Sequence, residues 1–250
     1  MPRHHTAIAL LLLLSLFACT TNPVAERGRS EANSENDPFE PFNRSIHNFN
    51  DSFDRAIFRP AAEVYRDYMP QPLDDAVTNF FRNLDDITVF INDLLQLKWQ
   101  AAATDLGRFT LNSTLGILGL MDVAKPLGLK KNDEDFGQTL AYWGVDSGPF
   151  LVLPFLGPSN LRDGFGRGIG WAVDSKIDID LYQSREQELQ ALALYGLDLR
   201  ANLLQTSNII NESGADSYIF IRQAYMQQRN YRVYDGKPPV ATFDDLFLEK

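Results

Sequence analysis

The sequence predicts an all-α fold, or one nearly so, from three observations. Apolar side chains recur at spacings of three and four residues, which places them on one face of a helix. Strand-like alternation hardly appears, and we find no internal repeat of 20 to 50 residues. Thirteen prolines and 16 glycines interrupt the pattern, so we expect short helices with sharp breaks. A length of 250 residues permits one large domain or two small ones.

The N-terminal segment is predicted to be an export signal that is removed. A cationic start precedes the apolar run from Ala7 to Phe17, and eleven residues are too few for a bilayer span, which needs roughly 20. The run ends in Leu16-Phe17-Ala18-Cys19, which resembles the bacterial lipobox, where a signal peptidase cuts before the cysteine and lipid is attached to it. We therefore expect a signal peptide over residues 1–18 and lipidation at Cys19.

Cys19 is the only cysteine in the chain. In an oxidising compartment a single thiol has no intramolecular partner, whereas an acylated one is chemically closed. Thr20, and not an aspartate, follows it, which resembles lipoproteins that are sorted to the outer membrane. Two alternatives stay open, namely a plain secretory signal that happens to hold a cysteine and a buried apolar thiol.

Residues 19–36 are predicted to be the lipidated cysteine and a flexible tether. From Thr20 to Asn36 there is no aromatic residue, so this stretch cannot bury enough apolar surface to order itself. As a coil, its 17 residues reach about 23 Å. We expect a helical domain over residues 37–236 and an acidic, mobile tail over residues 237–250.

The charge of the chain excludes some partners. After removal of residues 1–18 the formal net charge is −11. Such acidity argues against binding of nucleic acid and against electrostatic capture by an anionic membrane. The 29 aromatic residues suit a membrane interface, where amphipathic rings settle at headgroup depth.

The first helix is predicted to begin after Asp37-Pro38 and to be strongly amphipathic. A stripe of apolar residues follows one face, and polar residues such as Asn43, His47 and Asn50 surround the other side. The stripe consists of Phe39, Phe42, Ile46, Phe49, Phe53 and Ile57. It fits either the core face of a soluble helix or a helix lying in the headgroup boundary of a membrane.

Prolines predict where the next helices end. Arg59-Pro60 is expected to interrupt the chain before a short helix over residues 61–69, and Pro70 and Pro72 to break it again. A helix over residues 73–84 and a further helix to Leu97, capped by Asn83 or Asp85, are expected next. The same spacing continues from Trp99 to Ser113. Residues 115–121 are nearly all apolar, and no side of them suits water.

The segment Gly148–Asp163 reads GPFLVLPFLGPSNLRD. Its run Phe150–Leu156 is predicted to be a buried or membrane-dipping connector, because it is too short to cross a bilayer and Pro154 excludes a central strand and a long helix. Asn160 is expected to cap the helix that follows. The glycines of GFGRGIGW are not a phosphate loop, since the Walker lysine is missing and no strand leads in. Two late helices are predicted over residues 185–204 and 216–231.

Catalytic and metal-binding chemistry is poorly supported, so we predict no catalytic residue, no cofactor and no metal site. The mature chain keeps one histidine, His47, and has no Gly-x-Ser-x-Gly elbow for a serine hydrolase. Clustered histidine and cysteine ligands are absent from the sequence, and Asp133-Glu134-Asp135 fits a solvated loop better than a calcium site. Asp74-Asp75 and Asp85-Asp86 fit helix N-termini.

Several long motifs, in the right order, resemble the MlaA (VacJ-like) outer-membrane lipoprotein family. The resemblance runs from Asp37 to about Gly236. It is carried by DPFEPFNRSIHNFNDSFDRAIFRP with YRDYMPQP, then EDFGQTLAYWGV, GPFLVLPFLGPSNLRD and DSYIFIRQAYMQQRNYRVYDG. His47 stands where the family often has tyrosine, and Phe150 likewise lacks a hydroxyl.

The resemblance implies a ring of amphipathic helices embedded in the inner leaflet of the outer membrane of a Gram-negative bacterium, around a central amphipathic channel. Phospholipid misplaced in the outer leaflet would pass through the ring to a soluble periplasmic lipid-binding carrier, beside a trimeric porin. From helix geometry and the position of the first motif, we predict that Asn48, Phe49 and Asn50 belong to the channel or its gate.

Three functions compete at this stage. The first is a lipid conduit that maintains lipid asymmetry, and the second is a lipoprotein scaffold that docks to a porin without conducting lipid. The third and most distant is a phospholipid hydrolase, and we expect no enzyme activity. The sequence does not identify the lipid species, the porin, the gating mechanism, or the direction and energy source of transport.

Overall fold

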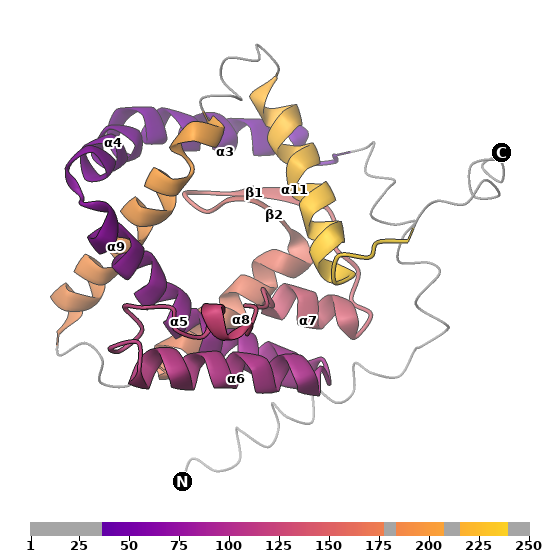
Figure 1. Ribbon diagram of the computed structural model, residues 1–250. Coiled ribbons are helices and arrows are strands. Elements are labelled where there is room, and N and C mark those ends of the chain that lie inside the picture. The colour runs from indigo at the N-terminus through magenta and orange to yellow at the C-terminus, as the bar shows by residue number, and fades with distance from the viewer. Residues whose placement is uncertain (1–36, 178–183, 208–215, 240–250) are drawn as a thin grey trace, which may run out of the picture.

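The computed structural model describes residues 37–177, 184–207 and 216–239 and confirms a mainly helical fold with one small sheet (Figure 1). The predicted signal peptide, Cys19, the tether and residues 240–250 of the tail lie outside the described residues. The helices are α3 (Glu40–Phe53), α4 (Arg59–Tyr68), α5 (Gln71–Leu95), α6 (Trp99–Thr114), α7 (Phe136–Tyr142), α8 (Leu161–Ile177), α9 (Arg185–Asn202) and α11 (Ser217–Val233).

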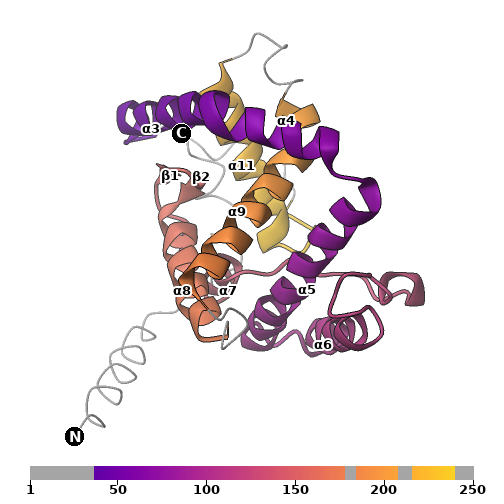
Figure 2. The same cartoon turned by 90° about the vertical axis from the view of Figure 1, so that its left-hand side faces the viewer.

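These helices form a ring, and contacts between neighbouring elements close it (Figure 1). Helix α4 packs against α9, α9 against α5, and α5 against α6, α7 and α8. Helix α11 packs against α7, and a hairpin of β1 (Phe150–Leu153) and β2 (Gly157–Asn160) links α11 and α8 to α3. In the view turned by 90°, the segment between α6 and α7 projects from one side of the ring, and the hairpin lies on the opposite side (Figure 2).

Pro60 changes the hydrogen-bond pattern of the first helix but does not end it, so the predicted interruption is only partly right. Helix α3 runs into a π-helical turn, Asp54–Phe58, and continues as α4. The amide of Arg59 bonds the carbonyl of Asp54, five residues earlier. The wider turn accommodates the hydrogen bond that Pro60, which has no amide hydrogen, cannot make.

The prediction of two short helices between residues 73 and 97 is wrong. Helix α5 is continuous over 25 residues, so neither Asn83 nor Asp85 caps a helix, and Asp85-Asp86 does not lie at an N-terminus. The Asn83 side chain donates to Ser113 Oγ at 2.9 Å, and Asp85 pairs with Lys131 at 3.1 Å. These side chains bond partners on other segments and therefore do not compete for their own backbone.

The connector predicted for residues 150–156 is buried at Phe150 and Val152 as expected, but its first half is strand β1 and not a connector. Strands β1 and β2 pair in antiparallel register, with Phe150 opposite Asn160 and Leu153 opposite Gly157. Pro154 follows the last residue of β1, so it removes no hydrogen bond from the pair. Asn160 caps α8 as predicted, since its Oδ1 accepts from the amide of Asp163 at 2.7 Å.

The acidic run Asp133-Glu134-Asp135 is not the solvated loop that the sequence predicts. Glu134 accepts hydrogen bonds from Lys98 at 2.9 Å and from Gln96 at 2.8 Å. The Asp135 side chain caps α7 by accepting from the amide of Gln138 at 2.9 Å. Only Asp133 is exposed. Partners on distant segments, which local pattern does not reveal, hold Glu134 and Asp135.

The distribution of polarity in the ring is unusual. Among the residues that the structure describes, 18 buried side chains are polar or charged and 10 are apolar, whereas 32 large apolar side chains are exposed. On the predicted apolar stripe of α3, Phe39, Phe42, Phe49 and Ile57 are all exposed. No helix in the described ranges combines the length and the apolar character needed to cross a membrane. Much of the stripe is therefore exposed and is not core.

Candidate functional site

A cavity of about 360 Å³ lies between the first helix and the hairpin. We call it the hairpin cavity. One wall is apolar and comes from the hairpin and α11, and the other is charged and comes from α3, the π-helical turn, the start of α4 and α9. The lining residues are His47, Asn50, Asp51, Asp54, Arg55, Arg59, Phe150, Val152, Phe155, Gly157, Pro158, Arg200, Leu203, Ser207, Ser217, Tyr218 and Ile221.

Two asparagines of α3 hold the hairpin in place. Asn43 is fully buried; its Nδ2 donates to the carbonyl of Phe150 at 3.0 Å and its Oδ1 accepts from the amide of Val152 at 2.9 Å. Asn50 repeats this arrangement two turns later, donating to the carbonyl of Leu153 at 2.9 Å and accepting from the amide of Phe155 at 2.8 Å. A spacing of seven residues puts both side chains on one face of the helix. The hairpin is thus bonded to α3 along the whole of β1.

The three predicted channel residues have different surroundings. Asn50 lines the hairpin cavity and bonds the hairpin. Phe49 is 48% exposed, and its ring packs edge-on against Phe155 at the hairpin turn, with centroids 5.3 Å apart. The Asn48 side chain is exposed and does not line the cavity. The structure therefore brings Phe49 and Asn50 to the hairpin and leaves Asn48 outside, and their role in a channel or gate stays a prediction.

The charged wall is held by ion pairs, of which one joins distant segments and two join residues four positions apart on the same helix. Arg200 of α9 forms a bidentate pair with Asp54, with distances of 2.6 and 2.8 Å. Arg55 pairs with Asp51 at 2.6 Å, and Arg59 donates to Glu63 at 3.0 Å. The π-helical turn places Asp54 and Arg55 at the cavity, a frequent use of such turns at functional sites. The wall presents fixed charges of both signs.

His47 forms the polar contact between α3 and α11. Its Nε2 lies 3.0 Å from Ser217 Oγ, and its ring meets the Tyr218 ring edge-on. Burial lowers the pKa of His47, which favours the neutral imidazole. The amides of Tyr218 and Ile219, at the N-terminus of α11, donate to the Asp216 side chain at 3.0 and 3.3 Å. These amides are therefore not available as an oxyanion hole beside the serine and histidine.

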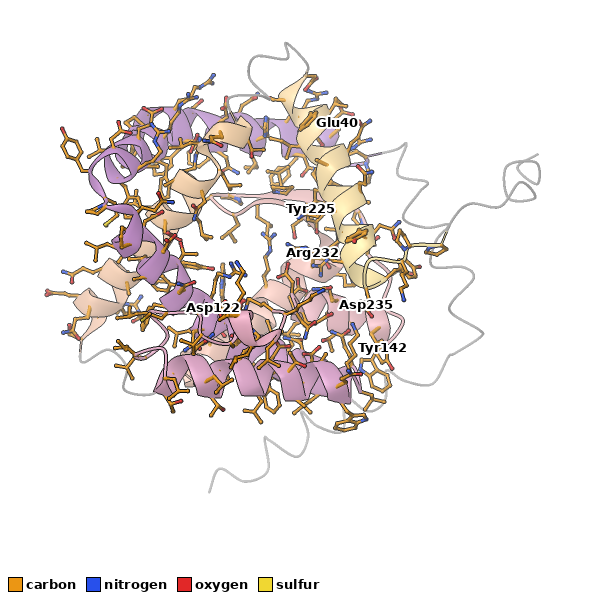
Figure 3. All side chains as sticks on the ribbon, in the orientation of Figure 1. Glu40, Asp122, Tyr142, Tyr225, Arg232 and Asp235 are labelled. Carbon is orange, nitrogen blue, oxygen red and sulfur yellow. The ribbon has the colours of Figure 1, made fainter. Side chains whose placement is uncertain are left out.

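Three of the sequence motifs meet in one buried network at the junction of α7, α8 and α11. Arg229 pairs with Asp135 at 2.5 Å and with Asp163 at 2.7 Å. Tyr225, which lies on α11 toward the hairpin in Figure 3, donates to Asp163 at 2.5 Å. Although burial opposes it, hydrogen bonding from Arg229 lowers the pKa of Asp135 to about 2. The sequence contained each motif, but no residue spacing connects segments 94 and 66 positions apart.

Comparison with known proteins gives consistent matches. The family model described as MlaA lipoprotein matches residues 35–232. The chain is 34% identical over 236 residues to the Intermembrane phospholipid transport system lipoprotein MlaA of Shigella flexneri and of Escherichia coli (strain K12), and the alignment covers 93% of this chain and 89% of each relative. The Haemophilus influenzae protein of the same name is 31% identical and is covered to 90%.

A solved structure is similar as well. It comes from work on the structural basis for maintenance of bacterial outer membrane lipid asymmetry. The TM-score is 0.66 at 31% sequence identity, and the match covers 80% of this chain and 100% of that chain.

Proposed function

The chain belongs to the MlaA lipoprotein family, and we propose that it is an outer-membrane lipoprotein that removes mislocalised phospholipid from the outer leaflet. The lipid passes through the ring by way of the hairpin cavity and is handed to a soluble periplasmic lipid-binding carrier. The protein is anchored through Cys19 on the periplasmic side, with its ring in the inner leaflet beside a trimeric porin. It thereby maintains outer-membrane lipid asymmetry.

The observation that carries this proposal is the inverted polarity of the ring together with its two-sided cavity. Exposed apolar side chains suit acyl tails, because they bury their surface only in a membrane or against a partner. The hairpin cavity offers an apolar wall at Phe150, Val152 and Ile221 and a charged wall at Arg55 and Arg59. A phospholipid has the same two parts.

The charged wall lowers the barrier to headgroup movement. Stripping a charged headgroup of water in hydrocarbon costs several kcal/mol or more. Arg55 and Arg59 supply hydrogen-bond donors for a phosphate, and Asp51 and Asp54 supply acceptors for an ammonium group. The cavity volume lies in the range of pockets that hold one small ligand, so it takes a headgroup while the tails lie against apolar surface.

A specific observation makes the hydrolase alternative testable. Ser217 Oγ lies 3.0 Å from His47 Nε2, the distance at which a histidine base activates a serine nucleophile. The amides at the N-terminus of α11 are bonded to Asp216, however, and catalysis of acyl transfer depends strongly on such donors. We expect purified protein to release no fatty acid or lysophospholipid from labelled vesicles; release that disappears in Ser217→Ala would replace the conduit by a hydrolase.

The conduit and the scaffold are separated by changes in the predicted channel residues. We expect Phe49→Ala and Asn50→Ala to alter lipid asymmetry while co-purification with the porin is unchanged, because a scaffold does not depend on the path inside the ring. Asymmetry is measured with a membrane-impermeant amine-reactive label of exposed phospholipid. Ser45→Ala, at an exposed site on the same helix, is the control. Normal asymmetry in both variants at wild-type abundance means that this segment has no role in the path.

A further inference from the structure

A second cavity, of about 590 Å³, lies between α5 and the segment over residues 122–131. Its lining holds the cations Arg82, Arg108, Lys125, Lys130 and Lys131 against two carboxylates, Asp75 and Asp122. We call it the basic cavity. Figure 3 places Asp122 at the inner edge of the ring, where α5 approaches α6. The whole chain carries a net charge of −10, so a local excess of cations calls for an anionic partner.

Two of the five cations are fixed by acidic neighbours. Arg108 pairs with Asp122 at 2.9 Å and lies 3.6 Å from Asp86. Lys131 also pairs with Asp86, which is fully buried, and with Asp85 at 3.1 Å. These charges form the fixed floor of the cavity.

The other three cations are exposed and have no such neighbour. Within residues 37–177, 184–207 and 216–239, the side chains of Arg82, Lys125 and Lys130 make no hydrogen bond or ion pair with another residue. Even when Asp85 and Asp86 are counted with the lining, positive charge is left over. Free guanidinium and ammonium groups around one cavity are typical of a phosphate site.

An exposed apolar loop adjoins the basic cavity and indicates which kind of phosphate compound fits. Residues 115–121 join α6 to Asp122, and the carbonyl of Leu120 accepts from Asn79, another lining residue, at 3.3 Å. Ile117 and Leu118 are 61% and 72% exposed. A free phosphate ion gains nothing from such a loop, whereas a lipid has acyl chains to lay against it.

We propose that the basic cavity binds the phosphodiester of an anionic phospholipid, whose acyl chains lie along residues 115–121. Arg82, Lys125 and Lys130 bind the phosphate, and Asp75 is the only lining carboxylate besides the Arg108-bound Asp122. An excess of free cations over free carboxylates favours a headgroup of net negative charge over a zwitterionic one. The inference rests on the proposed function for the supply of phospholipid, and it adds a headgroup site separate from the hairpin cavity.

The test measures binding of soluble short-chain lipids to the full-length lipidated protein in detergent by calorimetry. The probes are dihexanoylphosphatidylglycerol, dihexanoylphosphatidylcholine and inorganic phosphate. The test variant is Arg82→Gln/Lys125→Gln/Lys130→Gln. The control is Arg66→Gln/Arg185→Gln/Lys237→Gln, which removes the same charge at exposed sites away from the cavity. Circular dichroism shows whether both variants keep their helices.

We expect the test variant to bind phosphatidylglycerol about tenfold more weakly or worse, and the control to match wild type. Equal binding by wild type and the test variant overturns the site and leaves the proposed function standing, since lipid then binds elsewhere. Phosphatidylcholine binding as tightly as phosphatidylglycerol overturns the preference for an anionic headgroup. Inorganic phosphate binding as tightly identifies a free-phosphate site. A wild type that binds neither lipid contradicts the proposed function as well.

Discussion

At the residue scale, Arg229 is the side chain on which the junction of α7, α8 and α11 depends most. Arg229 is buried and pairs with two carboxylates. Asp163 is also buried, whereas the side chain of Asp135 is 47% exposed. Asp163 in turn accepts from Arg162 at 3.0 Å and from Asn160 at 2.7 Å. A buried carboxylate with this many donors is stable only while the cations are present.

Removal of the Arg229 guanidinium therefore destabilises the ring. We expect Arg229→Met to lower the free energy of unfolding by about 3–5 kcal/mol, because Asp163 is left buried without its main cation. Arg232→Met removes an exposed pair with Asp133 on the same helix and costs at most about 1 kcal/mol. Chemical denaturation in detergent compares the two, and equal losses would show that the buried network adds nothing.

Asp93 is a second buried charge with a consequence for pH dependence. It is fully buried near Asp105, and burial together with the neighbouring charge of Asp105 raises its pKa to about 8. The folded state therefore keeps a proton on Asp93 that the unfolded state, with a pKa near 3.8, releases. Its contribution to stability is full below about pH 4 and is lost as the pH rises through about 8.

We expect Asp93→Asn, which imitates the protonated acid, to become progressively more stable than wild type as the pH rises from 4 to 8. The difference in the free energy of unfolding grows by at most about 1.4 kcal/mol for each pH unit. Denaturation curves of both proteins at several pH values measure it. A difference that does not vary with pH contradicts the assignment of the proton to Asp93.

At the element scale, the hairpin and α3 act as one unit because Asn43 and Asn50 replace backbone partners along β1. The Val152 amide depends on Asn43, and the Phe155 amide depends on Asn50. The outer end of this unit carries Phe155, whose ring contacts Phe49 and Phe53. Movement of the hairpin turn is thus linked to one face of α3.

Amide hydrogen exchange separates the two asparagines. We expect Asn50→Ala to speed exchange at Phe155 and to leave Val152 protected, and Asn43→Ala to have the opposite pattern, because each alanine frees a different amide. Ser45→Ala, on the same helix, is the control and leaves both amides as they are. If each substitution exposes both amides to the same extent, the hairpin opens as a whole and the two bonds are not separate.

Helix positions were largely predictable from the sequence, whereas the partners of individual side chains and the pairing of the two strands were not. The apolar spacing predicted α6, α9 and α11, and Asn160 predicted the start of α8, because these signals are local. Asn83 and Asp85 were mistaken for caps, since their partners Ser113 and Lys131 are 30 and 46 residues away. The hairpin was missed because contacts with α3 and α11, which are distant in the sequence, and with α8 stabilise its four-residue strands.

The site was predictable only in part for the same reason. Asn50 lies on the polar side of the first helix and reaches the cavity as its helical position suggests. Asn48 lies between the polar and apolar sides, and a helical pattern alone does not say that it faces away from the hairpin. The pair of Asp54 and Arg200 joins segments 146 residues apart, which no local pattern contains.

At the scale of the whole molecule, polar side chains make up much of what is buried and many large apolar side chains are exposed in the described ranges. The loop over residues 115–121 exposes Ile117 and Leu118. Both residues also adopt left-handed backbone angles, with φ of 54° and 57°. Such angles cost roughly 1–2 kcal/mol for each residue that is not glycine. The buried contacts of Asn112 with Asp122 and Ala124 hold the ends of this loop together.

We expect a charge on the outer surface of α3 to weaken membrane association without unfolding the ring. Phe42 is 56% exposed, so Phe42→Asp removes no core contact but puts a carboxylate where acyl tails are proposed to lie. Partition of the lipid-free mature chain into liposomes should fall at least about tenfold. Ser45→Asp on the exposed polar side is the control, and an equal fall in both variants shows that charge alone is responsible.

Crosslinking with phospholipids that carry a photoreactive group in the headgroup or in an acyl chain, mapped by residue, tests most directly whether lipid passes inside the ring. The account requires the headgroup probe to mark the hairpin cavity, with Arg55, Arg59 and Phe155 among the labelled positions. The acyl probe is expected on outward side chains such as Phe42. A headgroup probe that marks only the outer surface and never the cavity would contradict it.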